Sequence, residues 1–314
     1  MPSVSIIFCT RNREASLRET LAAIELLTVP SGWDVQLVVV DNGSTDGTPA
    51  LLSSLRSEKY RIKTVLEPIA GVARGRNCGL AESTGEIILF TDDDVRPPVD
   101  WIERMCRPIV AGTADAVSGG IRMAPDLSRP WFGPMHRIMV ASTEGLTDAD
   151  VKNLICANCA VHRRVLQFVP GFDVELGPGT MGFGEDTLFS KQILAAGCRI
   201  ETHLDVQVEH HFDPSRITRT KFIDRMEREG HSRAYLDYHW EHAQPPSTPK
   251  TMVKSAYVRV RQLLHSIAAP QSQNISSREL CWIADVACAK QYTIEQRRER
   301  NYDRHGLVKL RGQM

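Results

Sequence analysis

The amino-acid sequence predicts an α/β fold, in which a mixed, mainly parallel sheet is flanked by helices and followed by a C-terminal helical extension. Two observations carry this prediction. Short apolar runs alternate with helical patterns over the first ninety residues, and such alternation produces crossover connections between parallel strands. After a Pro-rich linker at 244–249, apolar residues recur at helical spacing, which predicts helices outside the sheet.

The first part of the chain contains four expected strands and three expected helices. The strands are expected at 4–9, 35–40, 62–66 and 86–90, and the helices at 14–27, 49–55 and 72–83. Ligands bind to such sheets beyond the carboxyl ends of the strands. Polar clusters follow three of the strands, at 10–13, 41–47 and 91–94. This coincidence is the first indication of a functional site.

Beyond Trp101 the pattern is less regular. Further expected elements are a weak strand near 116–118, a strand at 154–161, a helix at 185–196 and an extended segment at 199–210. An irregular segment at 123–150 is rich in Pro, Gly and Met, and includes Trp131, Phe132 and Met135. This segment is either a loop that contacts a substrate or an ordinary packed insertion.

Two helical segments follow the linker. Val253, Val260 and Ile267 belong to an apolar series at helical spacing in the first segment, and a capping box precedes the second. The sequence therefore predicts a main domain at 1–244, with halves at about 1–115 and 116–244, and a basic helical extension at 245–314.

The composition is that of a soluble globular protein. The chain has 314 residues, 42% of them hydrophobic, with 38 Lys and Arg against 38 Asp and Glu. Zero net charge argues against a general binder of polyanions, so no nucleic-acid partner is expected. We see no apolar run of 18 residues and no signal peptide, and the eight cysteines are irregularly spaced. These observations predict a cytoplasmic location with reduced thiols.

The neutral total conceals two oppositely charged segments. From Pro245 onward twelve Lys and Arg stand against five Asp and Glu, so the extension carries +7 and the first 244 residues carry −7. A basic amphipathic extension either makes a peripheral contact with an anionic membrane or docks on the acidic main domain or on a second subunit. Docking is the favoured alternative.

Three adjacent carboxylates, Asp92, Asp93 and Asp94, follow the expected strand at 86–90. Like charges repel, and a divalent cation or a basic partner relieves the repulsion. Alternation along an extended chain predicts that Asp92 and Asp94 share one ligand. Carboxylates together with substrate phosphates are the usual ligands of magnesium or manganese. The alternative, a solvated acidic turn, is disfavoured because the preceding strand is apolar and central.

Asp41 and Asn42 follow the second expected strand, and Arg76 lies in the third expected helix. The Asp41 carboxylate is able to accept a hydrogen bond from a ligand N–H, and the following Asn-Gly pair permits a tight turn. Ser44 or Asp46 alternatively caps the next helix. Arg76 suits a diphosphate, although solvated arginines are common.

Glu185 and Asp186 stand in the first turn of an expected helix, behind a glycine-rich loop at 177–184. Carboxylates there stabilise the helix dipole, so a plain helix cap is one interpretation. The other is a general base presented by a mobile loop. His210 ends an extended segment and is either structural or a metal ligand.

Taken in order, these motifs resemble those of family 2 glycosyltransferases. The resemblance covers residues 3–235 and rests on 9–13, 41–48, Arg76-Asn77, 92–94, 184–186, and His210 with Pro214 and Arg216. It implies a Rossmann-like GT-A fold and transfer of a sugar from a nucleotide-sugar with inversion at the anomeric carbon. The halves of the main domain would then bind the nucleotide and the acceptor, with the segment at 123–150 as an acceptor-side loop.

The resemblance also implies a role for each site residue. The substrate-binding positions are Thr10, Asn12, Arg13, Asp41, Asn42, Arg76, Asp92 and Asp93. Asp94 would bind Mn²⁺ or Mg²⁺ on the diphosphate, with His210 as a further ligand, and the three-acid motif leaves Asp93 open as the direct ligand. Asp186 would deprotonate the acceptor hydroxyl, and Glu185 beside it would orient the substrate.

Two other functions remain open. A sugar-phosphate nucleotidyltransferase needs a glycine-rich loop after the first strand, and residues 10–13 contain no glycine. A nucleotide-sugar-binding protein without catalysis is disfavoured because Asp92, Asp94 and Asp186 are all present. We expect a UDP-linked donor and a saccharide or lipid-linked acceptor.

Overall fold

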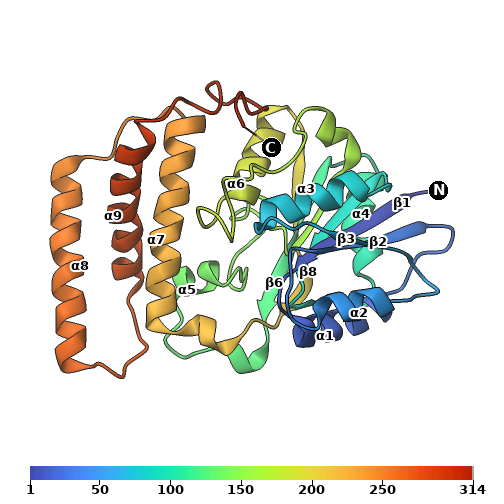
Figure 1. The fold of residues 1–314 in the computed structure, drawn as a ribbon, viewed down its shortest axis with the longest axis horizontal. Coiled ribbons are helices and arrows are strands. Elements are labelled where there is room, and N and C mark those ends of the chain that lie inside the picture. Colours follow the sequence, from blue (N-terminus) through green and yellow to red (C-terminus); the bar gives the residue numbers. More distant parts are fainter. Residues whose placement is uncertain (313–314) are drawn as a thin grey trace.

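The computed structural model describes residues 1–312 and has an eight-stranded sheet at its centre (Figure 1). The strand order is β3-β2-β1-β4-β7-β6-β8-β5. The first four strands are parallel, and the others form a mixed half because β7 runs antiparallel to both β4 and β6. The predicted fold class, a mixed sheet flanked by helices with a helical extension, is confirmed.

The parallel half follows the predicted order of elements. Its strands are β1 (Ser3–Thr10), β2 (Asp34–Asp41), β3 (Arg61–Leu66) and β4 (Ile87–Thr91), and its connecting helices are α1 (Glu14–Glu25), α2 (Thr48–Ser54) and α3 (Val72–Glu82). Thr10 and Asp41 pair in register at the ends of β1 and β2. Parallel pairing therefore brings the loops after these strands to one edge of the sheet.

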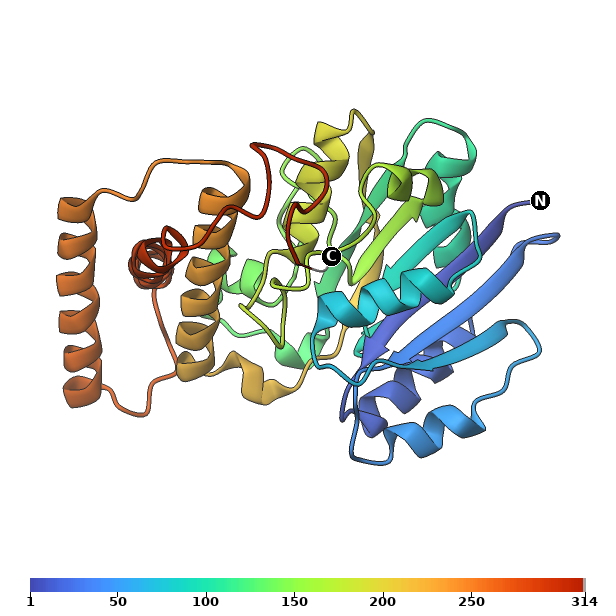
Figure 2. The same ribbon diagram turned by 45° about the horizontal axis from the view of Figure 1, so that its top comes forward.

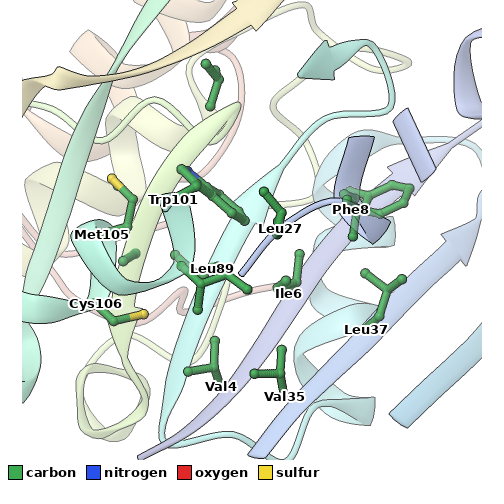
Figure 3. Packing of buried hydrophobic residues seen from close by; sticks show 14 of the residues in the cluster. Val4, Ile6, Phe8, Leu27, Val35, Leu37, Leu89, Trp101, Met105 and Cys106 are labelled. Atoms are coloured by element: carbon green, nitrogen blue, oxygen red, sulfur yellow. The ribbon is translucent and has the colours of Figure 1, made fainter. Parts of the chain in front are cut away.

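Alternate side chains of the central strands fill two apolar layers. On one face Val4, Ile6 and Phe8 pack with α1, α2 and α4 (Trp101–Val110), and Figure 3 shows Trp101 in this layer beside the strands. On the other face Ile7 packs with α3 and α6 (Glu185–Ala195). Because both faces are covered, the strands are apolar along their length, which explains why the sequence predicts them well.

The mixed half places one strand end beside the carboxylates after β4. Its strands are β5 (Val95–Arg96), β6 (Ala116–Met123), β7 (Asn158–His162) and β8 (Ile200–His210). The register of β6 with β8 shifts between Gly119 and Gly120, and a Cβ on Gly120 would lie 2.2 Å from the Leu204 carbonyl oxygen. β5 pairs with the end of β8, so Val95 lies opposite His210.

Three long helices form a layer beside the sheet. They are α7 (Arg219–Tyr235), α8 (Thr248–Ala268) and α9 (Ser277–Glu295). α7 packs closely on α9, since a Cβ on Gly230 would lie 2.3 Å from the Ala284 carbonyl oxygen. Figures 1 and 2 show α8 on the side farthest from the parallel strands. No helix within residues 1–312 is both long and apolar enough to cross a membrane.

The segment after α9 returns to the main domain and docks there through a buried polar cluster. Lys309 Nζ lies 2.6 Å from Asp173 Oδ1 and 2.8 Å from Glu175 Oε1. The Tyr302 hydroxyl donates a hydrogen bond to Asp173 at 2.7 Å. We call Asp173, Glu175, Tyr302 and Lys309 the C-terminal latch. The basic extension thus contacts acidic side chains of the main domain, immediately before the glycine-rich loop at 177–184.

The irregular segment at 123–150 contains a short helix, α5 (Pro134–Met139), and it packs against α7. The ring centroids of Trp131 and Phe132 lie 5.9 and 5.8 Å from that of Phe222 on α7. Met135 packs against the same apolar cluster. These three side chains therefore pack within an insertion, and the expected contact of this segment with a substrate stays a prediction.

Candidate active site

A cavity of about 520 Å³ lies beyond the carboxyl ends of β1 and β4. Most of the predicted polar side chains line it, namely Thr10, Arg13, Asn42, Arg76, Asp92, Asp93, Asp94, Glu185, Asp186 and His210. A second, more open cavity of about 1040 Å³ adjoins it, and the two share Arg13, Asp94 and Arg216 among their lining residues. The structure thus brings motifs from distant parts of the sequence into one site.

The three aspartates after β4 form a turn, and the alternation expected for an extended chain is wrong. Arg13 Nη1 donates to Asp93 Oδ1 and to Asp94 Oδ2, both at 2.7 Å. Asp93 and Asp94 therefore share a basic side chain, Arg13, whereas Asp92 faces Arg76 at 3.4 Å. The turn is anchored because the Asp93 carbonyl accepts hydrogen bonds from two hydroxyl groups of α1.

Asp94 is the most strongly neutralised carboxylate of the site. It contacts Arg13, Arg216 at 3.2 Å, and His210 Nε2 at 3.3 Å. Although burial favours the neutral acid, the hydrogen bond from His210 and the charges around Asp94 hold its pKa well below the usual range. Its neighbour Asp93 has fewer such partners, so burial raises the pKa of Asp93 to about 6.

His210, and not His211, faces the site. The His210 ring lies against Asp94, whereas the ring of His211 is turned to Glu209 at 2.7 Å. The Val140 carbonyl lies 3.0 Å from His210 Nδ1, and a carbonyl only accepts, so Nδ1 carries a hydrogen. Nε2 therefore needs either a proton or a cation between itself and the Asp94 carboxylate.

A second carboxylate group, Glu185 and Asp186, stands at the start of α6. Gly184 precedes it with a φ of 90°, a conformation that favours glycine. Glu185 Oε1 accepts a hydrogen bond from Arg76 Nη1 at 2.8 Å, and the same arginine lies over the Phe172 ring at 5.6 Å. Burial raises the pKa of both Glu185 and Asp186.

Three predicted residues hold the loops of the site in place. Asn12 accepts a hydrogen bond from the Thr45 N–H at 2.7 Å, and Asp41 accepts one from the Ser44 N–H at 2.8 Å. The Asn42 amide group bonds to backbone atoms of the segment at 67–71. Asn12 and Asp41 do not line the main cavity, so their expected substrate contacts stay predictions.

Helix α7 supplies site residues that sequence analysis does not assign. Asp224, Arg225 and Arg228 line the main cavity. Arg225 Nε is buried and has no hydrogen-bond partner among the residues the structure describes, and its guanidinium lies 5.1 Å from the Phe183 ring centroid. Burial lowers the pKa of Arg225 to about 9. A buried cation with unused donors is suited to an anionic ligand.

The side chains of the site are compatible with a divalent cation whose coordination shell is completed by the substrate. Within residues 1–312, no three His, Cys, Asp or Glu side chains form a ready metal cluster. Asp94 and His210 nevertheless lie within 3.3 Å of each other in the cavity. Magnesium and manganese often take one or two protein ligands and obtain the rest from phosphates and water, so these two residues fit such an ion.

Sequence comparisons connect this site to known proteins. The family described as Glycosyl transferase family 2 matches residues 5–169, just over half of the chain. The succinoglycan biosynthesis protein ExoM of Rhizobium meliloti is 27% identical over 237 residues, which are 74% of this chain and 74% of that protein. Glycosyltransferase AglE of Haloferax volcanii is 30% identical over 122 residues, 38% of this chain and 40% of its own length.

Solved structures support the same assignment at the level of the fold. The mannosyltransferase PcManGT from Pyrobaculum calidifontis, solved with GDP-Man and Mn²⁺, has a TM-score of 0.62 at 20% identity and covers 94% of this chain and 86% of its own. Residues 1–349 of S. aureus TarS, solved with UDP, have a TM-score of 0.52 at 17% identity, and the match covers 96% of this chain and 94% of that one. The chain therefore belongs to glycosyltransferase family 2 and has the GT-A fold.

Proposed function

We propose that this glycosyltransferase moves a sugar from a nucleoside-diphosphate sugar to an acceptor hydroxyl, with inversion at the anomeric carbon. One observation carries the proposal. A single cavity joins cationic side chains suited to a diphosphate with two carboxylates of raised pKa, Glu185 and Asp186. Glycosyl transfer needs both, because a leaving diphosphate gains negative charge while the attacking hydroxyl loses a proton.

The donor diphosphate would bind near Asp94, where Arg13 and Arg216 supply positive charge. Arg225 adds a guanidinium with an unused buried donor on the neighbouring helix. The nucleoside would lie toward Thr10 and Asp92, at the ends of β1 and β4. This arrangement follows the general rule for parallel sheets, whose ligands bind beyond the carboxyl ends of the strands.

Asp94 and His210 would hold a divalent cation on the diphosphate. The cation would supply Lewis-acid stabilisation of the departing nucleoside diphosphate. Asp94 suits this role because its pKa is held low, so it stays ionised throughout the physiological range. His210 suits it because the hydrogen bond between Nδ1 and the Val140 carbonyl fixes the ring and directs Nε2 to the cavity.

Asp186 would act as the general base. The acceptor oxygen forms a bond to the anomeric carbon, the bond from that carbon to the phosphate oxygen breaks, and the acceptor proton passes to Asp186. Glu185 is occupied by Arg76 at 2.8 Å, whereas the hydrogen bonds of Asp186 come from backbone N–H groups. The raised pKa of Asp186 brings its basicity closer to the working pH of an enzyme.

For the donor and the acceptor we propose only a chemical class. We expect a UDP-linked sugar, and GDP-linked sugars are the first competitors because fold neighbours were solved with UDP and with GDP-Man. A lipid-linked saccharide is a candidate acceptor. One relative from Campylobacter jejuni, 31% identical over 96 residues, is named as a glucosyltransferase that acts on a pyrophosphate-undecaprenol saccharide.

The test is incubation of the full chain with UDP- and GDP-sugars, with and without Mn²⁺, followed by assay of nucleoside diphosphate release and of product configuration by NMR. We expect release that depends on the cation and an inverted anomeric centre. A product of retained configuration would contradict the mechanism. Pyrophosphate release from UTP and a sugar-1-phosphate would instead indicate a nucleotidyltransferase, and UDP binding without turnover of any donor would indicate a binding protein.

A further inference from the structure

Helix α8 presents an apolar face to solvent. Six large apolar side chains on it are between 51% and 72% exposed, and together they form what we call the outer face of α8: Met252, Val253, Val260, Leu263, Leu264 and Ile267. At 100° per residue these positions fall within one continuous arc of the helix. Monomeric proteins rarely leave such a contiguous apolar stripe uncovered.

The opposite side of α8 is the one that holds it to the molecule. Val258 is buried there, and the Tyr257 ring lies 4.4 Å from the Trp282 ring of α9 between centroids. Lys254 pairs with Asp285 of α9. The outer face therefore plays no part in the contact between α8 and α9, and a different partner is needed to explain its apolar side chains.

Charge indicates the chemistry of that partner. From His242 to Arg278 the chain has five Lys and Arg and no Asp or Glu. On the helical wheel Arg259 falls at one border of the outer face, and Lys250 lies about 40° beyond the other border, past Tyr257. Neither takes part in an ion pair among the residues the structure describes. An apolar stripe bordered by basic side chains is complementary to an anionic lipid surface, in which a helix lies parallel to the membrane plane.

We propose that the outer face of α8 docks on an anionic membrane surface. A second copy of the chain is the less suitable occupant, because pairing two outer faces would bring their basic borders together. The docked orientation is defined by the layer of helices, since α9 separates α8 from α7 and α7 lines the catalytic cavity. With about 8–10 Å between packed helix axes, the axis of α7 would lie about 16–20 Å from that of α8, so the cavity would stand clear of the lipid surface.

The experiment is co-sedimentation of the full chain with phosphatidylcholine vesicles, with and without phosphatidylglycerol, at physiological salt. We expect binding only to the anionic vesicles. Leu263→Asp with Ile267→Asp should lower the partition coefficient by more than about tenfold, and Arg259→Gln should lower it about fivefold. Since these side chains are exposed, the variants should unfold at the same temperature as the parent chain.

A matched control keeps the result specific. Leu26→Asp changes a leucine of similar exposure at the end of α1 and should leave vesicle binding unchanged. Failure of the parent chain to bind, or equal binding by the double variant, would overturn the proposal, and so would a dimer that the double variant dissociates. Donor turnover in solution should be unaffected by these substitutions, so the result is independent of the proposed chemistry.

Discussion

Two groups of carboxylates line the same cavity, and their charges are balanced differently. Asp94 contacts two arginines and a histidine, whereas Glu185 and Asp186 share a single arginine, Arg76. Both groups are largely buried. The pKa of Asp94 is lowered by its partners, and the pKa values of Glu185 and Asp186 are raised by burial.

The difference in pKa suits the two groups to different chemical roles. A carboxylate that remains ionised is suited to hold cations and, through them, a diphosphate. A carboxylate with a raised pKa is suited to accept a proton during the reaction. The two groups stand on different elements, since Asp94 follows β4 and Asp186 lies in the first turn of α6. The variants below test whether the groups are functionally distinct.

The largest effect is expected for Asp186→Asn. An amide cannot take the proton from the hydroxyl of the acceptor substrate. The value of kcat should therefore fall by about 10²–10⁴-fold, with the donor affinity nearly unchanged. Glu185→Gln is the matched comparison, and it should reduce kcat less because its expected role is to orient Arg76 and the substrate. The measurement is steady-state transfer together with donor binding by calorimetry. A larger loss in Glu185→Gln would move the base to Glu185.

The second prediction concerns the C-terminal latch, which holds the segment before the glycine-rich loop and Asp186. Lys309→Met leaves Asp173 buried and without its cation, which should lower the free energy of unfolding by about 3–5 kcal/mol. Because the C-terminal latch lies just before the glycine-rich loop, kcat should also fall while the affinity for UDP is retained. Denaturant unfolding and UDP titration measure the two effects.

A double variant controls for simple loss of packing. Asp173→Asn combined with Lys309→Met removes both charges of the pair and should recover part of the stability. If the double variant is no more stable than the single one, the charge of Lys309 is not what stabilises the latch.

For the other carboxylate group we compare Asp94→Asn with Asp93→Asn. The Asp94 variant should lower kcat by about 10²–10³-fold and raise the Mn²⁺ concentration needed for half-maximal rate, since charge stabilisation of the leaving group is lost. The Asp93 variant should have the smaller effect, because Asp93 contacts Arg13 but not His210. The reverse order would make Asp93 the metal ligand.

The smallest expected effect is a dependence on pH, in which stability falls and activity rises as the pH increases. Burial raises the pKa of Glu185 from its usual value to about 7, so the native state keeps a proton that the unfolded chain has released. Stability should therefore fall by about 1–3 kcal/mol as pH rises from about 4.5 to 7, while kcat rises as Asp186 ionises. Asp93 and Asp186, whose pKa values burial also raises, contribute to the same slope. Glu185→Gln should therefore reduce the slope in stability without abolishing it, and an unchanged slope would exclude Glu185 as one of its sources.

The parallel half could be predicted from sequence because its signals are local. Strands covered on both faces are continuous apolar runs, and the polar clusters stand directly after them. Family motifs then identified Glu185, Asp186 and His210, which the structure brings to the same cavity. The rotation of Asp92 away from Asp94 was not predictable, because it depends on a turn whose anchors are hydroxyl groups of α1.

Helix α7 was missed for a different reason. Its charged residues line the cavity on one side of the helix, so they interrupt the apolar stripe by which a buried helix is recognised. Arg225 and Arg228 look like ordinary solvated arginines in the sequence, and only the packing of α7 beside the glycine-rich loop identifies them as site residues. The C-terminal latch is equally hidden, since its partners are 136 residues apart.

That separation has a consequence for how the molecule is made. Contacts between distant residues form late, because a long loop of chain must close before they are gained. During synthesis the sheet is able to assemble well before residue 309 leaves the ribosome, yet Asp173 then still lacks its cation. A nascent chain, or one that ends before Lys309, should accordingly open around Asp173 and offer that region to proteases.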